Sequence, residues 1–270
     1  MDNLFVFDLD GTIIMDNEKI NPLICQALRV LHNKGEEVVF ATSRSLRGVK
    51  EVLPIQLLKF PLILCNGAFA VVDGKFFSAG VISKGEYERI VCFLNKSSIP
   101  FYLDMGNELF IPAGVEHDFL TLLKQEAEGE KIIHELSEIK SNVYKIGIVQ
   151  PVRSDELKKI ESIGGRIRIY QHTDKTVDIV PLNCSKWKML QELKLSQNRK
   201  RVIAFGNDTN DIEMIKHADI GVAVCSSNKE LSDEAVMQVF DNTPESLVKK
   251  IEDICLSLIH ISEPTRLDVI

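Results

Sequence analysis

Two aspartates two positions apart, Asp8 and Asp10, follow directly after the short apolar run Leu4–Phe7. In an extended backbone, residues i and i+2 point to the same side, so both carboxylates can enter one small volume. Because neighbouring carboxylates repel each other, such a pair needs a cation or a proton between them. All-oxygen ligands with no nearby His or Cys fit Mg²⁺. Gly11 comes next and lets the chain leave the strand in a sharp turn.

A second oxygen-rich segment follows another apolar run. After Val-Ile-Ala-Phe at 202–205, the chain continues with Gly206, Asn207, Asp208, Thr209, Asn210 and Asp211. If the apolar run is a buried strand, these amide and carboxylate oxygens lie at its carboxyl end, where open α/β sheets bind ligands. The segment also fits a polar turn with an Asp at the start of a helix near Ile212. Taken alone, it leaves both interpretations open.

Two smaller signals lie between these segments. Thr42, Ser43 and Arg44 follow the strand predicted over 38–41, and hydroxyls with free N–H groups at such a place suit a phosphate or cap a helix. Lys186 opens a predicted helix, where a cation opposes the helix dipole unless an anion is close. A lysine on a solvated surface is the alternative for Lys186.

The pattern of apolar residues predicts an α/β fold in which another unit is inserted. Strands over 4–7, 38–41 and 62–65 alternate with helices that begin at Pro22 and near Leu46, as in a parallel sheet with crossover helices. Helices over 83–95, 116–126 and 155–163, with strands over 101–103, 108–111, 143–149, 166–170 and 176–180, indicate a separate α+β unit. After Pro181 the first pattern returns.

We therefore predict a Rossmann-like parallel-sheet core made of residues 1–77 and 181–256, with an inserted α+β domain over 78–180. Within the inserted domain, 107–112 and 170–174 are the segments expected to face the acidic residues. Residues 257–270 show no clear period and contain Pro264, so we expect a tail outside the fold, either disordered or foreign to the protein.

The charge, length and cysteine content of the chain limit the kinds of molecule that it is expected to bind and the compartment where it is expected to lie. The 270 residues carry 32 Lys+Arg and 39 Asp+Glu, a net charge of −7, which works against nucleic acids and anionic membranes but not against a small phosphorylated molecule. The length suits two domains, or one domain that carries a large insertion. No segment resembles a membrane span or a secretion signal. Six scattered cysteines without a CxxC pair predict reduced thiols and a cytoplasmic location.

Taken in order, these segments resemble the haloacid dehalogenase (HAD) superfamily of Mg²⁺-dependent phosphohydrolases, and within it the Cof-type branch, which carries a large α/β cap after the third core strand. The resemblance covers nearly the whole chain except the tail. It rests on Asp8-Leu9-Asp10-Gly11-Thr12, Ala41-Thr42-Ser43-Arg44, Asn66-Gly67-Ala68, the segment from Asp178 through Pro181 to Lys186, and 206–211 followed by Ile212-Glu213-Met214.

The resemblance implies a HAD-like fold and a phosphatase that works through an aspartyl-phosphate. Asp8 would be the nucleophile, Asp10 the general acid and base, and Lys186 the cation that keeps Asp8 ionised. The phosphate-binding set implied by the motifs is Leu9, Thr42, Ser43, Arg44, Asn66, Gly67, Lys186 and Asn210. The implied Mg²⁺ site draws on Asp8, Asp10, Asn207, Asp208 and Asp211.

One position departs from the family pattern. The fourth motif usually begins Gly-Asp, whereas this chain has Gly206-Asn207. An amide oxygen can still coordinate Mg²⁺ but brings less charge, and Asp208 or Asp211 could supply the missing charge directly or through water. We therefore expect weaker metal binding than is usual in the family.

The favoured function is hydrolysis of small phosphorylated metabolites, either sugar phosphates or phosphorylated cofactors. A sugar phosphomutase, a phospho-acceptor module similar to a signalling receiver, and a catalytically weak member kept for phosphate binding or regulation are the alternatives. The substrate is not predictable from the motifs, because specificity depends on the inserted domain and not on the fold. The oligomeric state is likewise not encoded in any motif.

Overall fold

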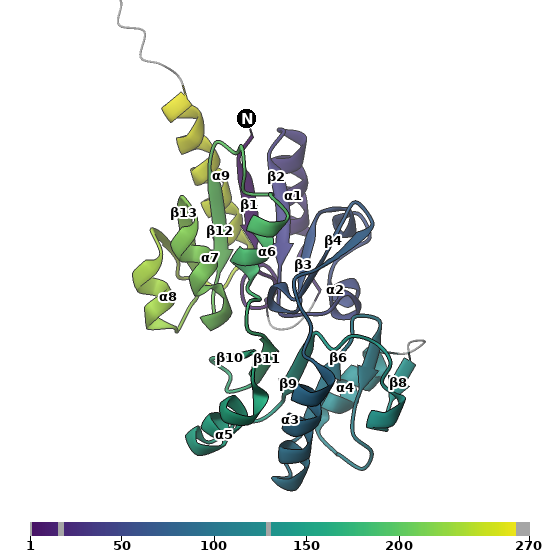
Figure 1. The fold of residues 1–270 in the computed structure, drawn as a ribbon. Helices are drawn as coiled ribbons and strands as arrows, with labels where there is room; N and C mark the ends of the chain where they lie inside the picture. The colour runs from purple at the N-terminus through teal and green to yellow at the C-terminus, as the bar shows by residue number, and fades with distance from the viewer. Residues whose placement is uncertain (1, 16–18, 128–130, 263–270) are drawn as a thin grey trace, which may run out of the picture.

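Two sheets, one above the other in Figure 1, organise the chain. The computed structural model describes residues 2–15, 19–127 and 131–262. Strands from the first and last parts of the chain form the upper, eight-stranded sheet, called the core sheet here. Strands between Phe101 and Pro181 form the lower, six-stranded sheet, called the cap sheet. The mixed α/β architecture with a parallel core agrees with the prediction.

The core sheet has the order β14-β13-β12-β1-β2-β3-β4-β5. Its first six strands are parallel, and β4 and β5 add an antiparallel hairpin at one edge. The strands are β1 (Leu4–Phe7), β2 (Glu37–Ala41), β3 (Leu62–Leu64), β4 (Phe69–Val72), β5 (Lys75–Ser78), β12 (Val202–Gly206), β13 (Ile220–Val224) and β14 (Met237–Val239).

Strand β1 is central because its side chains are apolar on both faces. Phe5 and Phe7 point to one helical layer, and Leu4 and Val6 point to the other, so all four are fully buried. The first layer contains α1 (Pro22–Asn33) and α9 (Pro244–Ser262), which contact each other. The second contains α6 (Lys186–Glu192), α7 (Ile212–His217) and α8 (Lys229–Glu234). Helix α2 (Leu46–Val52) lies on the side of the core that faces the cap (Figure 1).

The cap sheet has the order β10-β11-β9-β6-β7-β8 and is antiparallel except between β7 and β8. Its strands are β6 (Phe101–Asp104), β7 (Glu108–Phe110), β8 (Lys131–Ile133), β9 (Lys145–Ile148), β10 (Ile167–Gln171) and β11 (Val177–Pro181). Helices α3 (Lys84–Lys96) and α5 (Ser154–Gly164) cover one face through an apolar core of their own. Helix α4 (Asp118–Glu126) packs on the opposite face.

Two-residue alternation gives the cap sheet a polar face. Phe101 and Leu103 of β6 face the helices α3 and α5, whereas Tyr102 and Asp104 point the other way, towards the core sheet. The same alternation in β9 and β11 sends Lys145 towards the core sheet, together with Asp178. These charged side chains are nevertheless buried, so they must find partners across the junction.

Some elements differ from the sequence predictions. The strands β4, β5, β8 and β14 and the helix α8 were not expected, and the segment 257–262, predicted as tail, forms the last turns of α9. Leu258 explains the longer helix, because it continues the apolar stripe of Leu247, Ile251 and Ile254 into the core. Residues 263–270 lie outside the described part of the chain. Strands β5 and β11 each end one residue past the predicted domain boundaries, at Ser78 and Pro181.

The loop after β3 fixes the position of α6. Gly67 has φ +87°, and a Cβ there would lie 2.1 Å from the carbonyl oxygen of Ser185, the residue that caps α6. Only glycine therefore lets this loop approach the start of α6, where Lys186 is the first helical residue. Among the described residues, no helix has both the length and the apolar character needed to cross a membrane.

We expect Gly67→Ala to lower the free energy of unfolding by about 2 kcal/mol or more, because it combines backbone strain with a steric clash. Gly74→Ala is the matched control: Gly74 also has positive φ, but nothing lies within 4 Å of its Cβ position, so only about 1 kcal/mol should be lost. Urea unfolding of both variants measures the difference. Equal losses would show that close approach to α6 does not constrain residue 67.

Candidate active site

A buried lysine joins two aspartates from distant parts of the chain. The Nζ atom of Lys186 lies 2.7 Å from Oδ1 of Asp8 and 2.6 Å from Oδ1 of Asp211, and all three side chains are almost fully buried. The hydroxyl of Thr12 donates to the other oxygen of Asp8 at 3.0 Å. These contacts bring together the first, third and fourth predicted motifs, as the sequence led us to expect.

Strand ends and helix starts position this cluster. Asp8 follows β1, and its N–H donates to the carbonyl of Phe205 in the neighbouring β12 at 3.0 Å. Lys186 begins α6, where its charge opposes the helix dipole, and the two carboxylates supply the anions that the sequence argument required. Asp211 ends a single 3₁₀ turn, Thr209–Asp211, and accepts the N–H groups of Asn207 and Asp208.

The charges of the cluster depend on one another. Burial, followed by repulsion from Asp211, raises the pKa of Asp8 to about 7, although Lys186 opposes this rise. Burial disfavours the charged form of Lys186, but attraction to Asp211 and Asp8 outweighs it and raises the pKa of the ammonium. Lys186 therefore stays protonated, and the pKa of Asp8 lies above that of an ordinary aspartate. Another cation beside Asp8 would favour the carboxylate, which is the nucleophilic form.

Asp10 is held by an arginine. Its two oxygens accept hydrogen bonds from Nη2 and Nε of Arg44 at 2.6 and 2.7 Å, in a bidentate pair that leaves both side chains partly exposed. Gly11 follows with φ +72°. The turn directs the Asp10 carboxylate into the cavity between the core and cap sheets, where Asp8 also lies.

The residues around Asp8 suit a hard cation with oxygen ligands. A Cβ at Gly11 would lie 2.0 Å from Nδ2 of Asn207, so the Asn207 amide lies directly against the turn that carries Asp8 and Asp10. The donors here are carboxylate, amide and main-chain carbonyl oxygens, which fits Mg²⁺. Among the described residues, no group of three or more His, Cys, Asp or Glu side chains forms a metal site.

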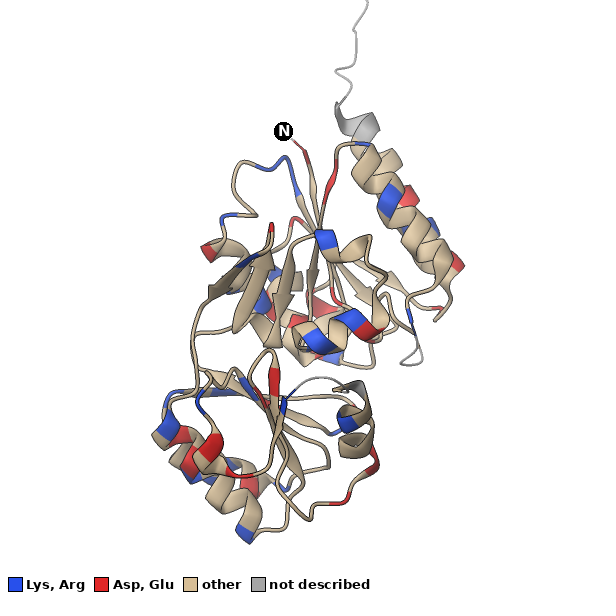
Figure 2. Ribbon diagram, turned by 90° about the vertical axis from the view of Figure 1, so that its right-hand side faces the viewer, with Lys and Arg blue, Asp and Glu red and all other residues tan. Residues whose placement is uncertain are grey.

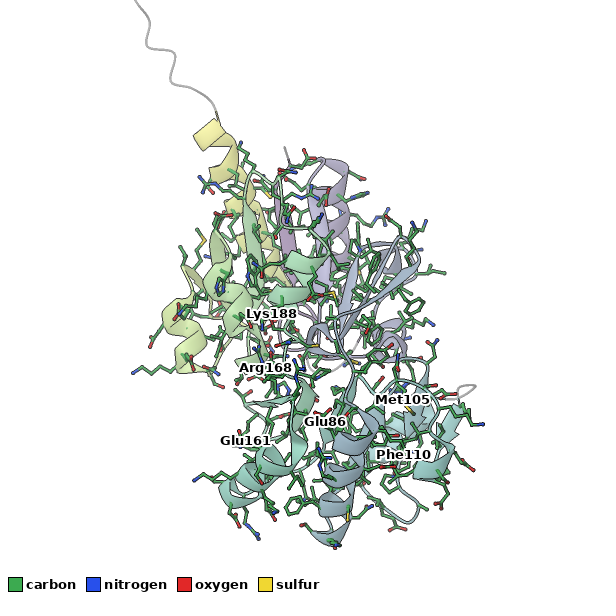
Figure 3. All side chains as sticks on the ribbon, in the orientation of Figure 1. Glu86, Met105, Phe110, Glu161, Arg168 and Lys188 are labelled. Atoms are coloured by element: carbon green, nitrogen blue, oxygen red, sulfur yellow. The ribbon has the colours of Figure 1, made fainter. Side chains whose placement is uncertain are left out.

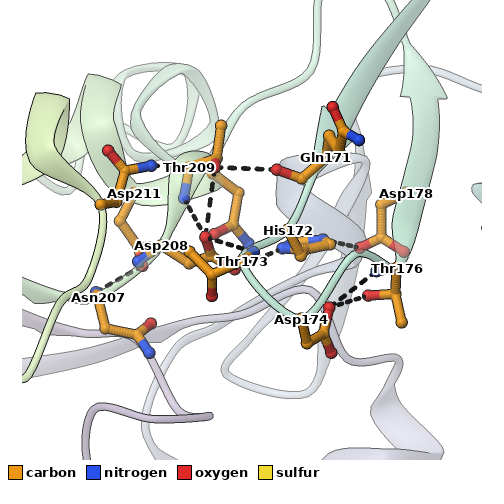
Figure 4. A network of polar contacts seen from close by, with 12 residues as sticks. Gln171, His172, Thr173, Asp174, Thr176, Asp178, Asn207, Asp208, Thr209 and Asp211 are labelled. Carbon is orange, nitrogen blue, oxygen red and sulfur yellow. Dashed lines mark hydrogen bonds and ion pairs between the residues drawn. The ribbon is translucent and has the colours of Figure 1, made fainter. Parts of the chain in front are cut away.

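Asp208, one of the predicted metal ligands, points to the cap instead. Its carboxylate lies 2.9 Å from Nδ1 of His172, and it accepts the N–H of Thr173 at 3.2 Å. Nε2 of His172 lies 3.2 Å from Asp178, so the imidazole bridges two carboxylates (Figure 4). Although burial opposes it, hydrogen bonds to Asp178 and Asp208 raise the pKa of His172 to about 10. These contacts favour a role for Asp208 in holding the cap, because its oxygens are already engaged.

Asp178 is the centre of a second buried network. It pairs with Lys145 at 3.2 Å and accepts a hydrogen bond from Asn66 at 2.8 Å. Asn66 in turn accepts from Asn210 at 2.8 Å, and Lys145 donates to the carbonyl of Ser43 at 2.9 Å. The network thus ties the cap sheet to the loops after β2, β3 and β12.

Further ion pairs cross the junction between the two sheets. Arg47 of α2 lies 3.2 Å from Asp104 of β6, and both are buried. Arg168 of β10, at the junction in Figure 3, lies 3.0 Å from Glu213 of α7. Figure 2 shows acidic and basic segments of both parts of the molecule meeting at this level. The charges therefore complement each other across the junction.

A cavity of about 720 Å³ lies between the core and cap sheets and includes Asp8 and Asp10. Of the predicted phosphate-binding residues, Ser43, Arg44 and Asn210 line it. Thr42 is buried, and its hydroxyl oxygen accepts a hydrogen bond from the N–H of Arg44, which stabilises the turn after β2. The remaining predicted residues do not line the cavity. The side chain of Leu9 lies in the apolar core, and Asn66 is fully buried. Gly67 packs on Ser185, and Lys186 contacts Asp8.

The cap contributes residues that carry no motif. The segment 170–174 reaches the cavity through His172, Thr173 and Asp174, in line with the expectation. The segment 107–112 does not: Phe110 is buried in the cap core, and Glu108 pairs with Lys131. Residues missed by the sequence analysis include Lys145, Arg47 and Asp104. The alternating polar positions in β6, β9 and β11 were the available signal.

We expect Lys186→Met to lower the free energy of unfolding by about 3 kcal/mol or more, because two buried carboxylates lose their shared cation. Adding Asp211→Asn should recover part of this loss, since one of the carboxylates is then removed. Urea unfolding at pH 7 measures both effects. Lys188→Met, on the same helix and partly exposed, is the control and should change stability little. A double variant less stable than Lys186→Met would contradict the argument.

We expect Asn207→Asp to lower the dissociation constant for Mg²⁺ about tenfold or more, because it adds a carboxylate beside Asp8 and Asp10. Isothermal titration with Mg²⁺ measures this directly. The exposed Asn198→Asp changes the net charge by the same amount away from the cavity and should leave the dissociation constant unchanged. If both variants bind Mg²⁺ more tightly by the same factor, the total charge of the protein, and not residue 207, is responsible.

Comparison with known proteins agrees with this geometry. The chain is similar to the 5-amino-6-(5-phospho-D-ribitylamino)uracil phosphatase YcsE of Bacillus subtilis, with 24% identity over 92% of this chain and 94% of that protein. It is 25% identical to the HMP-PP phosphatase of Cronobacter sakazakii over 86% and 87% of the two chains. Among solved structures, the HAD subclass IIB sugar phosphatase BT4131 has the same fold, with a TM-score of 0.78, 19% identity and coverage of 95% and 100%.

A family model also matches most of the chain. The model describes haloacid dehalogenase-like hydrolases and aligns with residues 5–251, which include every residue of the Asp8, Lys186 and Asp211 cluster and the whole cap sheet. On this match, together with the lysine-bridged aspartates at the strand ends, the chain belongs to the haloacid dehalogenase-like hydrolase family.

Proposed function

We propose that this protein is a Mg²⁺-dependent phosphatase that hydrolyses phosphate monoesters of small metabolites through a phosphorylated Asp8. The observation that carries the proposal is the buried contact between Lys186 and Asp8, the residue that follows the carboxyl end of β1. Asp10 lies two residues further along the chain. The names of the relatives support the class of reaction, since the two relatives named above are both phosphatases.

Asp8 supplies the nucleophile in this proposal. One carboxylate oxygen forms a bond to phosphorus as the bond from phosphorus to the leaving oxygen breaks. Lys186 holds the other side of the carboxylate at 2.7 Å and attenuates its repulsion with the anionic substrate. Thr12 donates a further hydrogen bond, so the carboxylate is oriented from two directions. Most of the catalytic effect then comes from positioning and charge neutralisation.

Asp10 is the proton carrier of the proposal. In its protonated form it gives a proton to the leaving oxygen in the first half of the reaction. The carboxylate that remains takes a proton from water in the second half, when water attacks the phosphorylated Asp8, and so regains the protonated form. Arg44 holds its carboxylate by two hydrogen bonds and keeps it directed into the cavity. Ser43 and Asn210 line the same cavity and can contact phosphoryl oxygens.

Mg²⁺, when bound, would neutralise charge on the phosphoryl group, and Asp8, Asn207 and the main-chain carbonyl of Asp10 are the residues that would hold it. These groups lie on the turn that carries Asp8 and Asp10 and on the Asn207 side chain packed against it, and they offer oxygen ligands without a nitrogen or sulfur ligand. The acidic charge of the chain supports a small phosphorylated partner over a nucleic acid. The six thiols, all free, support a cytoplasmic location.

We expect the protein to release inorganic phosphate from one or more small phosphate monoesters in the presence of Mg²⁺. Asp8→Asn should lower kcat about 10³-fold or more, because the amide cannot attack phosphorus. Asp253→Asn on the exposed side of α9 makes the same chemical change away from the cavity and should leave kcat unaltered. A metabolite panel with a phosphate-release assay measures both. Turnover that survives in Asp8→Asn would refute the nucleophile.

A further inference from the structure

Helix α4 of the cap presents apolar side chains to a largely polar cavity. The helix packs on the cap sheet through Leu120 and Leu123, which are buried. Phe119 and Leu122 lie on its other side and are 44% and 55% exposed. An amphipathic helix normally carries polar residues on its solvent side, so this pair needs a different explanation.

Both exposed side chains line the cavity that contains the catalytic pair. Phe119 and Leu122 belong to the wall of the same cavity as Asp8 and Asp10, together with the buried Val149 at the end of β9. The volume of about 720 Å³ is within the range of pockets for small molecules and exceeds what a phosphate alone would fill. The apolar wall is therefore available to the part of a substrate that leaves with the ester oxygen.

A second aromatic ring lies beside this wall. Tyr102 of β6 lies over Gly147, where a Cβ would come within 2.3 Å of the ring, so the sheet admits the ring only because residue 147 has no side chain. The ring of Phe119 lies 6.2 Å from that of Tyr102 at 38°, and the ammonium of Lys145 lies 5.4 Å from the Tyr102 centroid. Burial raises the pKa of Tyr102 to about 12, so its phenol stays neutral. Paired rings of this kind favour a planar apolar ligand.

Other parts of the cavity lining are polar and charged. Helix α2 contacts α4 and brings Arg47 and Glu51 to the cavity, and Arg44, which also lines it, pairs with Asp10. A ligand that reached from Asp8 to α4 would thus have its phosphate among charges and its far end against Phe119 and Leu122. Sugar hydroxyls placed there would lose water without gaining hydrogen bonds, whereas a ring would bury apolar area.

We propose that Phe119 and Leu122, backed by Tyr102, form a subsite for an aromatic ring in the leaving group of the substrate. This inference rests on the proposed phosphatase function and specifies its substrate class: phosphate monoesters of ring-bearing alcohols in preference to those of sugars. Phe119 is then a specificity-determining residue, because it contacts the leaving group and not the phosphoryl group.

The test compares two esters with similar chemistry at phosphorus. Benzyl phosphate and glucose 6-phosphate are both esters of primary alcohols, so a difference in kcat/KM reports recognition of the leaving group. We expect benzyl phosphate to be preferred about tenfold or more, and Phe119→Ala to lower its kcat/KM at least about fivefold while changing that of glucose 6-phosphate less than about twofold. Phe240→Ala removes an exposed ring outside the cavity and should change neither value.

A binding measurement separates this inference from the proposed function. Benzylphosphonate keeps the ring but cannot be hydrolysed, and its dissociation constant should rise at least about fivefold in Phe119→Ala, whereas that of inorganic phosphate should not change. If binding depends on the ring but no ester is hydrolysed, the phosphatase proposal is overturned and the subsite proposal is not. Phosphate release with no ring preference, or with equal losses for both esters in Phe119→Ala, would overturn the subsite. The subsite would also be overturned if the protein is a dimer that Phe119→Ala dissociates, because this face of α4 would then be an interface between two copies of the chain.

Discussion

The buried ammonium of Lys186 is the interaction on which the other features depend. It lies between Asp8 and Asp211, and a carboxylate without such a partner would be costly at this depth. Its partners come from the ends of β1 and the turn after β12, while the lysine itself begins α6. The cluster can form only if β1 and β12 are neighbours and α6 starts beside both. The strand order of the core sheet and the close approach of Gly67 to Ser185 satisfy that condition.

A comparable constraint governs the cap. Because strand residues alternate, the side of the cap sheet away from α3 and α5 carries Asp104, Lys145 and Asp178, all of them buried. Their partners come largely from the core loops. Separating the cap from the core would therefore leave several charged side chains without these partners or expose them to water. These contacts hold the cap against the core. The same contacts also fix Asn66 and Asn210 beside the catalytic turn.

Local patterns in the sequence predicted the parts of the site that local structure determines. The apolar run before Asp8 and the helix start at Lys186 are such parts, and both lie where they were expected. The hairpin β4–β5 was missed although Asp73-Gly74, between apolar residues, is a strong hairpin signal and both residues have positive φ. The partners of Lys145 and His172 could not be predicted in the same way. They depend on how the cap docks on the core, and no spacing within either segment encodes that docking.

Asn207 shows how closely the charges of the site are matched. Around the catalytic turn, Asp8, Asp10 and Asp211, when all are ionised, bring three negative charges against the two positive charges of Lys186 and Arg44. A carboxylate at position 207 would add a second uncompensated charge next to Gly11, which favours a divalent cation but repels the anionic substrate until that cation arrives. The amide avoids this repulsion, and in this structure its Nδ2 lies closer to the Gly11 turn than its oxygen does. An amide would hold a divalent cation less strongly than a carboxylate, because it brings no charge to the cation.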